Sequence, residues 1–238
     1  MNALEATQRF CNSVGMPAPT QMVASTSDDT IQMLALLNQA GRELASRHDW
    51  QVITFEGSFT TVATESQGTL ASIIGSSQVL KRIVDDTIWN RTTRQPVQGP
   101  LSQPVWEGYK ALTLTGPFPQ YRIRTNAIIF NPVPTAGQSC YFEYVSKCWC
   151  TDSTGVTSRV NIAADADLFL LDEELLMAGL EWRWLRKKGL SYAEEYASYE
   201  YLVKQAIRNE RPLPRLRMDV TTDVFRPGIF VPLGSWPL

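Results

Sequence analysis

The chain contains a single histidine, His48, so any serine or cysteine hydrolase arrangement would have to use it as the base. Nucleophilic catalysis needs a base within hydrogen-bond reach of a Ser or Cys, and an acid that orients that base. His48 stands between Arg47 and Asp49, at the end of a predicted helix and close to Trp50. A histidine in such a position commonly caps the helix or packs on the nearby ring. We therefore expect His48 to be structural and the protein not to be an enzyme.

Metal chemistry is not indicated by the remaining candidate ligands. The four cysteines are Cys11, Cys140, Cys148 and Cys150, and no CxxC pair or pair of histidines occurs. In a strand-like run, Cys148 and Cys150 would point the same way, about 6.7 Å apart, at the edge of disulfide geometry. We predict free thiols, no metal site and no cofactor.

Two adjacent pairs of carboxylates, Asp85–Asp86 and Glu173–Glu174, could suggest glycoside hydrolysis. Neighbouring residues face opposite ways on a strand and diverge by about 100° on a helix, so neither pair converges locally. We interpret the first pair as an exposed edge or loop and the second as the first turn of a helix. The segment 68–75 also lacks the Lys-Ser/Thr that a phosphate-binding loop needs.

Aromatic residues near the C-terminus could stack on nucleotide bases, but their spacing favours packing. Tyr192, Tyr196 and Tyr199 recur at i, i+4 and i+7, which is typical of one helix face in a core or a subunit interface. We predict that these three tyrosines form a subunit interface. The basic cluster Arg183, Arg186, Lys187 and Lys188 is interpreted as a solvated helix end that could instead pair with acids of a neighbouring subunit.

Composition indicates a globular protein without a strong affinity for nucleic acid. Hydrophobic residues make up 44% of the 238 residues, charged residues 19%, and the net charge is −2. A free nucleic-acid binder usually shows a basic domain, which is absent here. No apolar run reaches the ~20 residues that span a bilayer, and the polar N-terminus lacks a signal-peptide pattern. We expect synthesis in a cytoplasm and no membrane partner.

Two helices are predicted at the start of the chain. The first covers 3–14, where Asn2 and Glu5 have the spacing of a capping box. Ser25 and Asp28 repeat that spacing before a second helix that continues to about residue 47.

After Trp50 the apolar period changes to two, which predicts strands. The first strand is expected to break at Gly57, and Asn126 is expected to form a turn between two later strands. Further strand-like segments cover residues 79–89, 121–124, 127–130 and 138–149. Residues 66–78 are predicted to be a flexible loop. One helix, at about 102–113, is expected to begin at Ser102 with Pro104 in its first turn.

Residues 168–211 are predicted to form a helical hairpin. Asp165, Asp167 or Asp172 could begin its first helix, and Gly189 ends it. Only about two residues then separate the helices, so they should run antiparallel.

These elements indicate an α+β fold, with a helical bundle of N- and C-terminal helices, an inserted antiparallel β domain and an extended C-terminal tail. The expected division is 1–48 for the N-terminal helices, 49–163 for the β domain, 164–211 for the hairpin and 212–238 for the tail.

The tail combines five prolines with many large apolar residues and shows no periodicity. Such a segment cannot form a core of its own, and leaving it in water would be unfavourable. We therefore expect another protein surface to receive it. The 27 residues reach at most about 90 Å when fully extended, which is enough to leave the subunit and cross a neighbour. Folding back across its own helices is the alternative. The predicted docking residues are Arg215, Leu216, Arg217, Phe225, Arg226, Ile229, Phe230 and Trp236.

Three stretches carry a resemblance to a known family. They are WNRTTRQPVQGPLSQPVWEGYKAL, YRIRTNAIIFNPVPTAGQSCYFEYVSKCWC and DADLFLLDEELLMAGLEWRWLRKKGLSYAEEYASYEYLVKQA. In order and pattern the chain resembles the head-to-tail adaptors of tailed bacteriophages, the tail-tubular-protein-A-like gateway or connector adaptors. The likeness covers residues 1–211, and the segment 212–238 departs from it.

The resemblance implies a virion protein assembled in the bacterial cytoplasm. Family members form a ring, commonly dodecameric, that joins the portal to the tail tube or nozzle and surrounds the channel for genome exit. The implied partners are the portal protein, the tail tube or nozzle protein, further copies of the chain, and double-stranded DNA that passes without sequence recognition. The alternatives are another head-completion or stopper ring of the same junction, or a nucleic-acid- or carbohydrate-processing enzyme.

Overall fold

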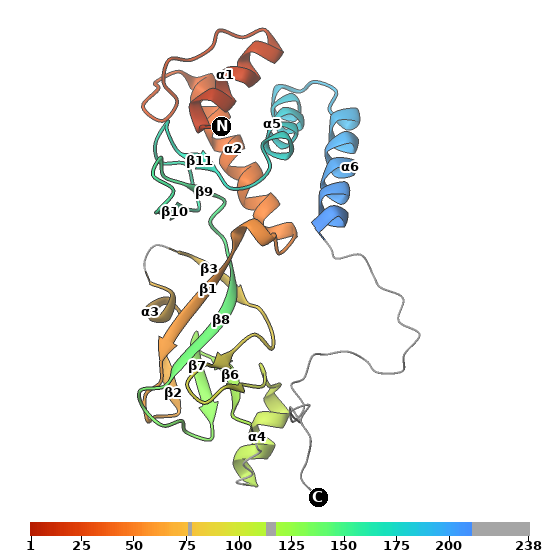
Figure 1. The fold of residues 1–238 in the computed structure, drawn as a ribbon. Helices are drawn as coiled ribbons and strands as arrows, with labels where there is room; N and C mark the ends of the chain where they lie inside the picture. The colour runs from red at the N-terminus through yellow and green to blue at the C-terminus, as the bar shows by residue number, and fades with distance from the viewer. Residues whose placement is uncertain (76–77, 113–117, 211–238) are drawn as a thin grey trace, which may run out of the picture.

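The computed structural model describes residues 1–75, 78–112 and 118–210, and the elements fall into a helical end and a β-rich end (Figure 1). The helices α1, α2, α5 and α6 lie at one end, and the longest strands extend away from them (Figure 1). Every pairing between strands is antiparallel. The fold class is therefore α+β, as predicted.

Helix α1 (Ala3–Val14) begins and ends as its sequence predicts. The Asn2 side chain accepts the Glu5 N–H at 2.8 Å, and the Glu5 carboxylate accepts the Asn2 N–H at 3.0 Å. This capping box satisfies two backbone donors that the helix itself cannot pair. Gly15 closes the helix with φ of 75°, a conformation that glycine adopts without steric cost.

Helix α2 (Asp28–Arg47) begins differently from the prediction. Its N-cap residue is Ser27, and Ser25 Oγ accepts the Ser27 N–H at 3.2 Å, so no Ser25–Asp28 capping box forms. Asp28 and Asp29 lie in the first turn, where their negative charges interact favourably with the positive end of the helix dipole.

Helices α5 (Glu173–Lys188) and α6 (Ala193–Glu210) form the predicted antiparallel hairpin with one correction. The first helix begins at Glu173, because the Asp172 side chain accepts the N–H groups of Glu174 and Leu175. Residues 168–169 form a strand instead. Gly189 ends α5 with φ of 74°, as predicted. Helix α5 packs against α1, α2 and α6.

The helical end has its own hydrophobic cluster, and residues from the 149–171 region contribute to it. The Trp149 ring is fully buried against Gly41 of α2, where a Cβ atom would overlap the ring. Trp149, Cys150 and Ile162, which the sequence analysis assigns to the β domain, belong to this helical cluster.

The central sheet has the order β1-β8-β4-β5, with β3 also paired to β8. A short 3-10 helix at Gln51–Ile53 leads into β1. The strands are β1 (Thr54–Thr60), β3 (Leu80–Ile83), β4 (Trp89–Asn90), β5 (Gln95–Pro96) and β8 (Ser139–Ser146). Gly57 does not break β1, because it pairs with Phe142 and leaves room for that ring, which a Cβ would meet at 2.7 Å.

The second sheet has the order β2-β7-β6. It consists of β2 (Ser66–Thr69), β6 (Gln120–Arg124) and β7 (Ala127–Asn131). The predicted turn is confirmed, with φ of 49° at Thr125 and 59° at Asn126. The loop prediction for 66–78 is wrong over most of its length, because β2 and α3 (Leu70–Ile74) occupy it.

Two smaller features complete the described chain. Helix α4 (Gln103–Ala111) has Ser102 as its N-cap residue and a proline in its first turn, as predicted. The third sheet, with the order β10-β9-β11, joins β9 (Cys150–Thr151), β10 (Ser158–Arg159) and β11 (Leu168–Phe169) beside the helices (Figure 1). The strand predicted at 138–149 corresponds to β8, which ends at Ser146. Within the described ranges, no helix has both the length and the apolar character that crossing a bilayer requires.

Candidate docking surface and the junction beside it

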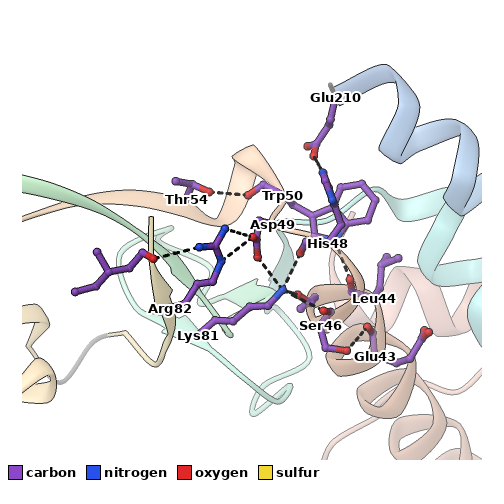
Figure 2. Close-up of polar contacts among 12 residues, drawn as sticks. Glu43, Leu44, Ser46, His48, Asp49, Trp50, Thr54, Lys81, Arg82 and Glu210 are labelled. Carbon is purple, nitrogen blue, oxygen red and sulfur yellow. Dashed lines mark hydrogen bonds and ion pairs between the residues drawn. The ribbon is translucent and has the colours of Figure 1, made fainter. Parts of the chain in front are cut away.

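His48 is the C-cap residue of α2, as the sequence predicts. Its ring lies edge-on to Trp50, with centroids 5.2 Å apart, and its Nε2 atom lies 3.3 Å from a Glu210 carboxylate oxygen (Figure 2). His48 therefore connects the end of α2 to the end of α6. Neither a serine nor a cysteine is among these partners.

A lysine connects the two ends of the molecule. Figure 2 shows Lys81 extending from β3 toward the last carbonyl groups of α2. Its Nζ atom donates to the carbonyls of Ala45, Ser46 and His48 at 2.9, 3.1 and 2.9 Å, and lies 3.1 Å from Asp49 Oδ1. An ammonium group here satisfies helix carbonyls that have no partner within the helix and opposes the negative end of its dipole.

Asp49 is the acidic member of the same junction. Partial burial works to raise the pKa of its carboxyl, but hydrogen bonds from Arg82 and Lys81 outweigh burial and leave the pKa below its usual value. Arg82 donates to Asp49 Oδ2 from Nε at 2.8 Å. The junction is therefore an ion-pair network between β3 and the segment that follows α2.

The two acid pairs lie where the sequence analysis places them. Glu173 and Glu174 stand in the first turn of α5, where they pair with the Met1 ammonium and with Arg9. Asp85 and Asp86 lie in an exposed turn after β3, with Asp86 at φ of 59°.

All four cysteines are buried free thiols. Burial raises the pKa of Cys140 to about 11 and that of Cys150 to about 12, so both remain protonated and unreactive near neutral pH. Among the residues that the structure describes, no group of three or more His, Cys, Asp or Glu is arranged to hold a metal ion.

The three interface tyrosines separate into two environments. Tyr199 is 0% exposed, and its hydroxyl donates to Glu43 Oε2 at 2.6 Å. Burial, followed by this hydrogen bond, raises the pKa of the Tyr199 hydroxyl. Tyr199 belongs to the core of its own chain, so we withdraw it from the predicted subunit interface. Tyr192 and Tyr196 remain exposed.

The basic cluster of α5 also divides. Arg186, Lys187 and Lys188 lie in the exposed last turn, as expected. Arg183 is buried instead, where it donates to the Gly179 carbonyl at 2.6 Å and to Glu43 at 3.2 Å. Its guanidinium lies over the Trp182 ring, 4.3 Å from the centroid. Arg183 therefore stabilises the contact between α2 and α5.

The exposed apolar surface of α6 is the strongest candidate for contact with another subunit. Helix α6 lies at the edge of the helical end, where it packs mainly against α5 and also contacts α2 through Tyr199 and Glu200 (Figure 1). Tyr201 is 68% exposed and Leu202 is 37% exposed, and we call the surface formed by these two residues the outer face of α6. This face was not predicted from the sequence, because the spacing of Tyr192, Tyr196 and Tyr199 indicates the side of the helix that packs against Trp182. The exposed apolar pair between Glu200 and Lys204 was the available signal.

A groove of about 360 Å³ lies where α6 ends. Its walls come from the end of α2 and the 3-10 helix, the start of α5, and the end of α6. The lining is mostly apolar and includes Leu44, Trp50 and Leu171, while its charged members are Asp172 and Glu210.

The predicted docking residues of the tail lie outside the described residues: Arg215, Leu216, Arg217, Phe225, Arg226, Ile229, Phe230 and Trp236.

Comparison with known proteins identifies the family. The model of a family described as SU10 adaptor protein matches residues 1–226. The match continues past residue 211, where the resemblance seen in the sequence ends, and so includes the first part of the tail. A comparison with curated proteins finds no match. The family match confirms the likeness to phage head-to-tail adaptors. The chain belongs to the SU10 adaptor protein family.

Proposed function

We propose that this adaptor forms a dodecameric ring between the portal and the tail tube or nozzle of a phage particle, around the channel through which DNA leaves. The family match over residues 1–226 is the observation that carries this proposal. The role is structural, with no catalytic step. Assembly occurs in the bacterial cytoplasm, and the finished ring is part of the virion.

The charge of the chain suits a channel through which DNA slides. Each phosphate that a protein neutralises releases counterions and adds affinity, so a strongly basic channel would retain DNA. The net charge of −2 avoids this effect. Contacts between the ring and DNA would then be weak and independent of sequence.

Ring closure requires two different surfaces on each copy, because a head-to-tail interface is heterologous. The outer face of α6 is suited to one side of this interface, and the predicted interface residues Tyr192 and Tyr196 are exposed as well. The edges of the β-rich end are available for the other side. A tyrosine such as Tyr201 at the centre of a contact is the kind of anchor that contributes most to binding.

Two domains and a docking tail complete the proposal. Residues 1–48 and 164–211 form the helical domain, and residues 49–163 form the inserted β domain. Two hydrophobic clusters support two domains, although Trp149, Cys150 and Ile162 of the β segment pack into the cluster of the helical domain. Residues 212–238 contact the portal or an adjacent subunit through the arginines and large apolar side chains of the tail.

The double variant Tyr201→Glu/Leu202→Glu tests the interface. Two charges on the outer face of α6 should prevent ring formation and leave a folded monomer, because buried unpaired carboxylates are strongly unfavourable. Sedimentation velocity and native mass spectrometry would measure the oligomer, and circular dichroism would verify the fold. Val156→Glu, at a residue that is 75% exposed in the turn between β9 and β10, is the matched control.

Rings of unchanged size in the double variant would exclude α6 from the interface. A wild-type chain that stays monomeric both alone and with purified phage heads would contradict the proposed ring itself.

A further inference from the structure

The groove at the end of α6 is the largely apolar hollow nearest the point where the described chain ends. Its apolar residues come from three elements that are distant in sequence, including Trp50 after α2, Leu171 before α5 and Ala206 in α6. Val52, which also lines it, is 48% exposed. Apolar surface of this kind gains free energy when another side chain covers it.

The end of α6 is held at the edge of this groove by three contacts of Glu210. The Gln51 N–H donates to Glu210 Oε1, and the Gln51 side chain donates to the Glu210 carbonyl, both at 3.3 Å. His48 contacts the other carboxylate oxygen (Figure 2). Since Glu210 itself lines the groove, the next residues of the chain start at its edge.

We propose that the groove binds residues 211–217 of the same chain, with Leu213 and Leu216 against its apolar walls. This inference deepens the proposed function and rests on it, because it gives the docking tail a fixed origin. Leu213 and Leu216 are the first two large apolar residues after Glu210, three and six positions away. At about 3.3 Å per residue both can reach the groove.

The sequence of the segment suits this site. Pro212 and Pro214 favour the polyproline II conformation, in which side chains three residues apart share one face, as Leu213 and Leu216 would. Arg211, Arg215 and Arg217 alternate with them. The charged residues of the lining, Asp172 and Glu210, are both acidic, so the charges are complementary.

Residues 211–217 of the same chain are favoured as the occupant over the same segment of a second copy, because they are covalently attached beside the groove. A tether of a few residues gives an effective concentration of about a millimolar or more, which exceeds the concentration of free neighbouring chains in solution. Arg215, Leu216 and Arg217 are thereby assigned to the groove of their own chain. Phe225, Arg226, Ile229, Phe230 and Trp236 remain for the portal or a neighbouring subunit.

Hydrogen exchange on the isolated full-length protein tests the proposal. In Leu213→Asp/Leu216→Asp, backbone amides of the groove walls, in segments 50–54 and 170–175, should exchange about tenfold faster than in wild type. The matched control is Val231→Asp/Leu233→Asp in the distal tail, which should leave those amides unchanged. Both pairs lie in the tail, so neither change removes a contact within the described fold.

Equal exchange in wild type and Leu213→Asp/Leu216→Asp would overturn the proposal. Protection that disappears on dilution would also overturn it, because the occupant would then be the tail of a second copy. The measurement needs no phage partner, so its outcome is independent of the proposed function. Attachment to purified heads, assayed separately with the distal variant, tests that function.

Discussion

At the scale of single residues, Lys81 connects the β-rich end to the helical end through its contacts with Ala45, Ser46, His48 and Asp49. Replacing it in Lys81→Met would leave the carbonyls of Ala45, Ser46 and His48 without their donor and Asp49 without one of its two cations. Hydrogen bonds to charged groups contribute about 1.5–3 kcal/mol, so we expect the free energy of unfolding to fall by about 2 kcal/mol. Urea denaturation would measure this loss.

Lys110→Met is the control for that substitution. Lys110 pairs with Glu65 at 2.7 Å on an exposed surface, and such pairs contribute less than about 1 kcal/mol. An equal loss in both variants would show that Lys81 has no special role at the junction.

Asp49 makes the stability of the junction depend on pH. Because its folded pKa is lowered, its contribution is present above the unfolded value of about 4 and is lost as the pH falls through the folded pKa. Asp49→Asn should therefore be less stable than wild type at pH 6, and the difference should shrink as the pH falls below about 4. Urea unfolding of both proteins across this range would show it. A difference that is independent of pH would contradict the assignment.

Single residues also show what the sequence could and could not reveal. His48 was placed correctly, because one histidine at a helix end beside a tryptophan has few structural alternatives. Tyr199 was misassigned, because an i, i+4, i+7 spacing defines a helix face but not what covers it. Tyr199 is buried because Glu43 and Arg183 approach it from other helices. No local pattern contains that information.

At the scale of elements, α2 depends on a glycine within its length. Gly41→Ala should destabilise the protein by about 1–3 kcal/mol, because the added methyl group would overlap the buried Trp149 ring. The expected change in stability has the opposite sign to the effect of helix propensity alone, which favours Ala over Gly by about 1 kcal/mol. Thermal and urea unfolding would measure it.

Gly108→Ala in α4 is the matched control. A Cβ there would meet nothing within 4 Å, so propensity alone should stabilise the protein by about 0.5–1 kcal/mol. Stabilisation by both substitutions would show that Trp149 can move away from α2 at little cost.

Elements with local signals were predicted well, and elements that depend on distant partners were not. Helix α1 has its capping box and its terminal glycine within its own sequence, at Asn2, Glu5 and Gly15. Strands β9, β10 and β11 contain two residues each and exist because they pair with one another. Strand β2 likewise exists through its pairing with β7. A four-residue segment cannot show periodicity, so its strand depends on tertiary context.

At the scale of the whole molecule, the β-rich end is an insertion between helices that pack together. The chain leaves α2 at Asp49 and returns through β8 and Trp149, and β1 and β8 pair along their length. The sequence predicted helices towards both ends of the chain and strand-like segments between them, and the structure has this order. The groove was not predicted, because three separate segments form it.

Deletion of residues 212–238 should separate folding from assembly. The described fold has its core without the tail, so we expect the truncated protein to fold, with an unfolding temperature lower by about 2–4 °C because the proposed groove contacts of Leu213 and Leu216 are lost. Attachment to purified phage heads should be lost if the tail docks the portal or a neighbouring subunit. Differential scanning calorimetry and co-sedimentation with heads would measure the two properties. Undiminished attachment would exclude the tail as a docking segment.

The position of the only imidazole in the chain offers a direct spectroscopic readout. One histidine gives one set of ring-proton resonances in a nuclear magnetic resonance spectrum, which needs no engineered label to assign. Because that ring touches Glu210, its chemical shifts respond to whatever binds where α6 finishes. Titrating the protein with a portal fragment while following these signals would show whether binding changes the surroundings of the end of α6, where the tail begins.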